Sequence, residues 1–320
     1  MKNAEYVGAV CSFREKSIIS QEKFEKMLTM SLPEAIKTLK DSGFGGGLET
    51  TDAESLIRAE ENNLISFIKE YAPNDNFINF KLLNYDYHNA NSIVRAVNLN
   101  INQEKMLIRE GRFSYNELSS FIASGEGDIE SKFLKEAIIE AKKLFESGKA
   151  TGAKLDDIFL KAKYQEALSL VKKEKSLKAF VQAEIDGANV STAIRSQNAE
   201  FLKEAFILGG NISLSDLVYF IETGKLTNSL KASVFGSVLL KTLADFKKGK
   251  ALVEFEKVKD DYALSTLIKD KYTVAGYDIF YLYCYYKENE IKNARIVTVG
   301  LSAGLDKADI KARMRVNYAG

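Results

Sequence analysis

Hydrophobic residues recur at spacings of three and four along most of this chain, which is the pattern of helices that bury one face. Only two prolines, Pro33 and Pro73, interrupt that pattern. Segments such as 130–145 and 155–171 combine Ala, Leu and Ile with Lys and Glu, residues that lose little side-chain freedom in a helix. The pattern therefore predicts an all-α protein.

One short sequence template occurs three times. An apolar residue precedes a serine, and further apolar residues follow it three and four positions apart. The three copies are residues 19–28 (ISQEKFEKML), 113–122 (FSYNELSSFI) and 212–221 (ISLSDLVYFI). A serine at a helix start accepts hydrogen bonds from backbone amides that have no partner within the helix. We therefore predict that Ser20, Ser114 and Ser213 are the N-caps of three helices, each with one apolar stripe.

A second template follows the first at a distance of about 70 residues. Its five positions recur with a displacement of 100 residues: Asp86, Asn89, Ser92, Val94 and Arg95, then Asp186, Asn189, Thr192, Ile194 and Arg195. We predict that Asp86 and Asp186 are helix caps as well. A weaker third copy lies at 288–297, where the acid is Glu288 and where Ile291 and Val297 replace Asn and Arg.

The two templates divide the chain into three predicted helical repeat units, residues 1–105, 106–208 and 209–320. Solenoid repeats are about 20–50 residues long, whereas this repeat is about a hundred, so each unit can fold on itself. A general helical scaffold that binds a protein partner in a concave surface remains the alternative.

Arg95 and Arg195 occupy equivalent positions of two repeats, and they are the candidate partner contacts of the sequence. Equivalent charges in two similar units could face the same partner. An arginine can equally neutralise a carboxylate of its own chain, and we favour this second interpretation.

Composition narrows the function classes. The net charge is +1 with a pI near 7.6, which provides no basic field for nucleic acid. Cys11 and Cys284 have no CxxC spacing, and His88 is the only histidine, so we expect no catalytic, cofactor-binding or metal-binding residues and no small-molecule substrate. The glycines at 43–47 lack the Gly-Lys-Ser/Thr ending of a phosphate loop, and we interpret them as a connection between helices.

Several segments together resemble a known family, the C subunit of the archaeal and bacterial V-type and A-type ATPases, called d in eukaryotes. The resemblance extends over the whole chain and depends on the order and spacing of its parts. Those parts are Tyr6–Val10, Ser17–Ser20, Ser31–Ile36, Asp86–Ala96, Gly209–Ile212 and Glu288–Asn293. The glycine-rich 43–47 loop departs from the family's usual loop.

The resemblance implies three similar helical domains arranged as a pseudo-threefold funnel. It implies a non-catalytic adaptor on the cytoplasmic face of the membrane, between the D and F subunits of the central stalk and the membrane proteolipid ring. The stator protein in the membrane is a further candidate partner. Rotation would then pass through rigid helices and large contact areas, in support of ATP-linked proton or sodium ion transport.

Overall fold

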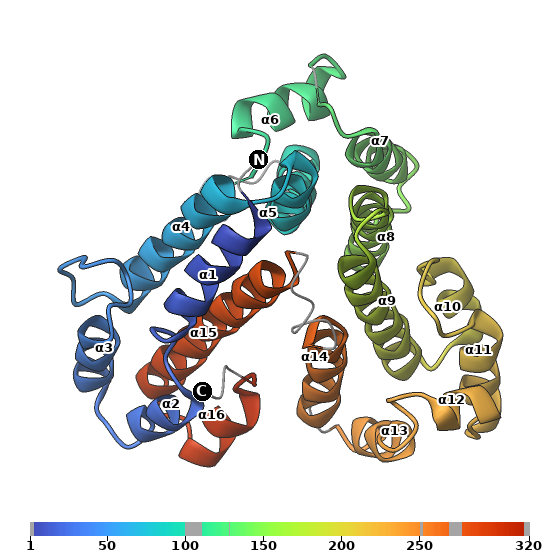
Figure 1. Ribbon diagram of the computed structural model, residues 1–320. Coiled ribbons are helices and arrows are strands. Elements are labelled where there is room, and N and C mark those ends of the chain that lie inside the picture. Colours follow the sequence, from blue (N-terminus) through green and yellow to red (C-terminus); the bar gives the residue numbers. More distant parts are fainter. Residues whose placement is uncertain (1–2, 100–110, 128, 250–251, 269–276, 317–320) are drawn as a thin grey trace. The chain divides into compact units, whose positions relative to one another are not determined.

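The computed structural model describes residues 3–99, 111–127, 129–249, 252–268 and 277–316 of the chain. These residues form helices and no strand, which confirms the all-α prediction (Figure 1). Contacts divide the chain into two compact units. The first unit comprises residues 1–74 and 234–320, and the second comprises residues 75–233.

The first unit is built around one long helix, α15, which packs against α1, α2, α3, α4, α14 and α16. Figure 1 shows α15 beside α1 and α4. The helices of this unit are α1 (Ala4–Glu15), α2 (Gln21–Met27), α3 (Leu32–Asp41), α4 (Ala53–Tyr71), α13 (Leu239–Lys247), α14 (Val253–Ile268), α15 (Asp278–Ser302) and α16 (Lys307–Arg313).

The second unit has two long helices, α5 and α9, that both pack on α8. α5 also contacts α6 and α7, and α9 also contacts α10 and α11. Its helices are α5 (Asp75–Leu99), α6 (Tyr115–Ser124), α7 (Lys132–Glu146), α8 (Gly152–Leu170), α9 (Lys175–Ser196), α10 (Ala199–Ala205), α11 (Leu214–Thr223) and α12 (Asn228–Ala232).

The three serines of the first template are the N-cap residues of α2, α6 and α11. Ser20 accepts a hydrogen bond from the amide of Lys23 at 3.3 Å, Ser114 from Glu117 at 3.3 Å, and Ser213 from Asp216 at 3.1 Å. Glu117 also accepts from the amide of Ser114 at 2.7 Å, which completes a capping box.

The apolar stripe that follows each serine points into the core. Its buried members are Phe24 and Met27 in α2, Leu118, Phe121 and Ile122 in α6, and Leu217 and Phe220 in α11. Burial of side chains of this size contributes about 1.5–3 kcal/mol each, relative to leaving them exposed to water. The cap and the stripe therefore act together on short helices that would be marginal in isolation.

The division into three repeat units stays a prediction. The boundary proposed at residues 105 and 106 lies outside the described residues, and the funnel arrangement is likewise untested.

We predict that Ser114→Ala and Ser213→Ala each lower the free energy of unfolding by about 1 kcal/mol, because each leaves amides of a first helical turn without an acceptor. Urea unfolding would measure the change. Ser120→Ala, at an exposed interior position of α6, is the matched control and should cost nothing. A loss in the control as large as that in Ser114→Ala would contradict the role of the cap.

Candidate functional site

A buried carboxylate in the middle of α5 binds the segment that leads into α6. Oδ1 of Asp86 accepts hydrogen bonds from the backbone amides of Arg112 at 2.6 Å and Phe113 at 3.4 Å. Oδ2 accepts from Nε of Arg112 at 2.5 Å. Burial raises the pKa of Asp86, and the Arg112 guanidinium opposes that rise. These bonds fix the two residues immediately before Ser114.

A second carboxylate, Glu166 of α8, shares the same arginine. Nη1 of Arg112 lies 2.8 Å from one oxygen of Glu166. The other oxygen accepts from the Tyr87 hydroxyl at 2.8 Å and from the Ser131 hydroxyl at 2.5 Å. Ser131 is itself the N-cap of α7. One buried network thus connects α5, α7, α8 and the segment before α6, and hydrogen bonds to charged groups are worth about 1.5–3 kcal/mol each.

The equivalent aspartate of α9 makes the same backbone contacts without an arginine. Asp186 is 1% exposed, and its Oδ1 accepts from the amides of Asn211 at 2.6 Å and Ile212 at 2.8 Å. The side-chain amide of Asn211 donates to Oδ2 at 3.1 Å. Among the described residues no lysine or arginine pairs with Asp186. Burial raises the pKa of its carboxyl, with the amides of Ile212 and Asn211 opposing.

The prediction that Asp86 and Asp186 are helix caps was wrong for the helices that contain them. α5 begins at Asp75 and α9 at Lys175, so both aspartates lie about three turns inside a helix. An interior carboxylate cannot accept from its own helix's amides, because these already bond within the helix. Each aspartate instead binds the residues before the N-cap serine of a later helix.

The third copy of the template is shifted by two residues from its predicted register. Glu290, rather than Glu288, accepts from the amide of Ile19 at 2.7 Å, directly before Ser20. Asn293 then takes the role of Asn189: it exchanges two hydrogen bonds with the backbone of Arg315, as Asn189 does with Ile207. The same contact therefore occurs three times, at the starts of α6, α11 and α2.

Glu290 has its own cation. Nζ of Lys287 lies 2.5 Å from Glu290 and 2.5 Å from Glu60 of α4. Burial lowers the pKa of Lys287, but the two carboxylates outweigh burial and raise that pKa overall. For the carboxyl of Glu290 burial acts in the other direction and raises the pKa, while Lys287 lowers it. This network connects α4 and α15 with the segment before α2.

The glycine-rich loop is a connection between α3 and α4, and its amide binds a carboxylate of the protein itself. The amide of Gly45 donates to Glu60 at 2.7 Å. Gly45 has φ +82°, and a Cβ there would collide with Leu56. Glycine is therefore required by close approach to α4 as well as by the backbone conformation.

Arg95 and Arg195 both lie near the beginning of α8. Arg95 forms an ion pair with Asp156 at 2.6 Å and donates to the carbonyl oxygen of Gly152 at 3.1 Å. Arg195 lines a hollow of about 530 Å³ together with Asp156 and Asp157. For Arg95 the intramolecular interpretation of the sequence agrees with this geometry, and a partner contact for either arginine stays a proposal.

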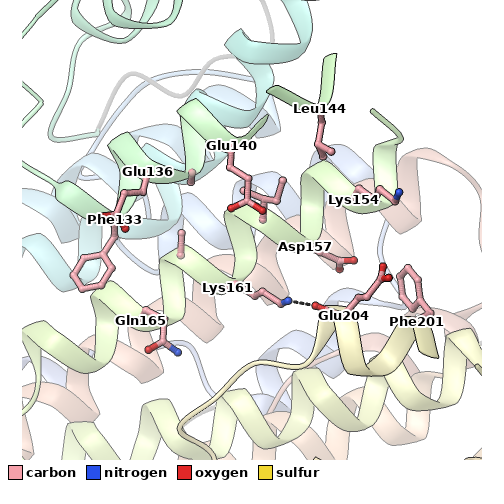
Figure 2. A pocket seen from close by; sticks show the side chains of 13 residues that line it. Phe133, Glu136, Glu140, Leu144, Lys154, Asp157, Lys161, Gln165, Phe201 and Glu204 are labelled. Atoms are coloured by element: carbon pink, nitrogen blue, oxygen red, sulfur yellow. Dashed lines mark hydrogen bonds between the residues drawn. The ribbon is translucent and has the colours of Figure 1, made fainter. Parts of the chain in front are cut away.

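A groove of about 500 Å³ lies beside this region in the second unit, between α7, α8 and α10 (Figure 2). Glutamates of α7, an aspartate and lysines of α8, and a glutamate of α10 line it. They are Glu136, Glu140, Asp157, Lys154, Lys161 and Glu204. Figure 2 shows the dashed contact from the Lys161 ammonium to the backbone oxygen of Glu204.

The counter-ions and the groove were not predicted from the sequence. Arg112 directly precedes the second copy of the serine template, residues 113–122. A search for a cation that could pair with a buried acid could therefore have found it. Glu166 and Glu60 lie far in the sequence from their partners Arg112 and Lys287 and carry no local signal, whereas Lys287 lies only three residues before Glu290. The groove is formed by faces of three helices whose exposed residues resemble any solvated surface.

Two kinds of site are absent from the described residues. No group of three or more His, Cys, Asp or Glu side chains is placed to hold a metal ion. No helix in that part of the chain has the length and apolar character needed to span a membrane.

Comparison with known proteins gives a match along nearly the whole chain. The family model of the ATP synthase (C/AC39) subunit matches residues 7–313. The A-type ATP synthase C subunit of Haloferax volcanii is 24% identical, with 98% of this chain and 97% of that protein covered. The corresponding protein of Halorubrum lacusprofundi is 23% identical with the same coverage. The V-type sodium ATPase C subunit of Enterococcus hirae is 25% identical, covering 95% and 96%.

We predict that Arg112→Leu lowers the free energy of unfolding by about 3–5 kcal/mol, because Asp86 and Glu166 would remain buried without a cation. Arg95→Leu removes a partly exposed pair, whose side chains are 30% and 61% exposed, and should cost less than about 1 kcal/mol. Urea unfolding of both variants would measure the difference. Equal losses would contradict the structural role of the Arg112 network.

We also predict that Asp186→Asn changes the pH dependence of stability. Because the pKa of Asp186 is raised in the folded state, its stabilising contribution is complete below the ordinary aspartate pKa and is lost as pH rises through the raised value. The free energy of unfolding of the wild type should therefore fall relative to that of Asp186→Asn as pH rises from about 4.

Asp216→Asn is the control of opposite sign. Hydrogen bonds from Thr227 and Ser213 lower the pKa of Asp216, so its contribution is present above the ordinary pKa and lost as pH falls. Urea unfolding across a pH series would measure both variants. If the difference in stability between wild type and variant changed with pH in the same direction for Asp186→Asn and Asp216→Asn, the opposite pKa shifts assigned to these two residues would be refuted.

Proposed function

This chain belongs to the ATP synthase (C/AC39) subunit family, and from that membership we propose that it is the adaptor that connects the rotor stalk of a rotary ATPase to its membrane ring. In this proposal the D and F subunits bind one side and the proteolipid ring binds the other. The chain carries no active site and lies at the cytoplasmic face of the membrane. It serves ATP-linked transport of protons or sodium ions.

The observation that carries the proposal is the extent of the match. The family model covers residues 7–313, and the relatives are covered over at least 96% of their own length. The correspondence therefore extends along nearly all of this chain and of the relatives, not along one shared domain. The relatives belong to A-type ATP synthases and to a V-type sodium ATPase, so the chain is a component of a machine of this class.

The internal construction supports a mechanical role. A rotating adaptor must pass torque without local unfolding, which requires helix connections that resist separation. In each unit, buried carboxylates bind backbone amides at helix starts, at Asp86, Asp186 and Glu290. Breaking such a contact while the carboxylate stays buried leaves it without its donors, which costs several kcal/mol, so the connections resist separation.

The test is affinity purification of the tagged chain from detergent-solubilised membranes of its native cells, followed by mass spectrometry. We expect the D and F subunits and the proteolipid to co-purify in fixed ratio, and we expect the purified chain alone to hydrolyse no ATP. The untagged strain, taken through the same purification, is the control. An eluate that contains the chain but no other rotary ATPase component would refute the proposal.

A further inference from the structure

The groove between α7, α8 and α10 has a floor formed by one face of a single helix. The α8 residues that line it recur three and four positions apart: Lys154, Asp157, Ile158, Lys161, Ala162 and Gln165. At 1.5 Å per residue this face is about 16 Å long, or roughly three helical turns.

The two neighbouring helices form the walls. α8 contacts both α7 and α10, so the groove runs along α8 between them. Figure 2 shows Glu136, Glu140 and Leu144 on the α7 side and Phe201 and Glu204 on the α10 side. Residues of α7 on this wall are also three and four apart, as expected for one helix face.

Small and apolar residues lie among the charged ones that line the groove. Ile158 and Ala162 belong to the α8 floor, and Leu144 belongs to the α7 wall. Small residues at a helix contact let another helix approach, and helix pairs pack 8–10 Å apart when their side chains interdigitate. The groove therefore suits a helix with an apolar stripe.

The rim has an excess of negative charge. Glu136, Glu140 and Glu204 are exposed and form no ion pair within the described residues. Asp157 is half-buried, and burial raises the pKa of its carboxyl, with Lys161 opposing. Of the two lysines, Lys161 is engaged with the backbone oxygen of Glu204 near the end of α10.

We propose that this groove binds an α-helix of another protein of the assembly, one that carries Lys or Arg on the side facing Glu136 and Glu140 beside a stripe of small apolar residues. Complementary charge would orient that helix along α8, and its stripe would contact Ile158 and Ala162 of the floor and Leu144 of the α7 wall. Anionic ligands such as lipid headgroups carry the wrong sign for this rim. The inference depends on the proposed function only for the source of the helix.

Photo-crosslinking in the assembled complex tests the occupant. p-Benzoylphenylalanine is introduced at Glu140, on the wall of the groove, and separately at Glu146, on the same helix but outside the groove. After irradiation of purified complexes, mass spectrometry identifies the linked segment. We expect position 140, and not position 146, to link to one helical segment rich in Lys or Arg.

The outcomes separate the two proposals. Complexes that contain every component but give no adduct at position 140 would overturn the groove and leave the adaptor function intact. An adduct with an acidic segment, a lipid or a second copy of this chain would overturn the groove as well. A chain that is missing from the complex altogether would refute the adaptor function instead.

Charge reversal gives a second readout. Glu140→Lys should weaken retention of the chain in the complex at least about tenfold and move its dissociation to lower salt, because like charges would then face each other. Glu146→Lys is the matched control and should leave retention unchanged. Glu140 is exposed, so thermal unfolding of the isolated variant should match that of the wild type. Equal retention of the two variants would contradict the proposal.

Discussion

The structure depends on one recurring interaction. A buried carboxylate inside a long helix accepts hydrogen bonds from the backbone amides of the residues just before a short, serine-capped helix. It occurs at Asp86, Asp186 and Glu290. A helix start has amides without intrahelical partners, and a serine satisfies only some of them. The carboxylate extends that satisfaction to the preceding residues, and it fixes where the next helix begins relative to the long one.

The three copies differ in how the buried charge is balanced, although the backbone contact is the same. Asp86 has Arg112, Glu290 has Lys287, and Asp186 has only amide donors among the described residues. A buried carboxylate with a hydrogen-bonded cation is well compensated, whereas amide dipoles alone compensate it less. The segment before α11 is thus the least compensated of the three, and its stability depends most on protonation.

Local chemistry made much of this fold predictable. Helical periodicity and the scarcity of proline indicated an all-α chain, and the serine template located the starts of α2, α6 and α11, because a cap is chosen by its immediate neighbours. The recurrence of Asp86 and Asp186 was visible in the sequence, but its meaning was misread. A repeated acid indicates a repeated contact without revealing whether the acid lies at a helix start or inside a helix. The partners Glu166 and Glu60 are distant in sequence, and the register of Glu290 is set by packing that periodicity does not encode. The α7–α8–α10 groove could not be anticipated at all, since it follows from how three faces meet.

The contacts of α15 have a mechanical consequence for the first unit. Glu290 holds the segment before α2 near the beginning of the sequence, and Asn293, less than one turn further along, holds Arg315 near its end. Tension applied to either terminal segment would therefore load neighbouring points of α15, three residues apart. These contacts of α15 therefore resist a force that pulls either terminal segment away from the first unit.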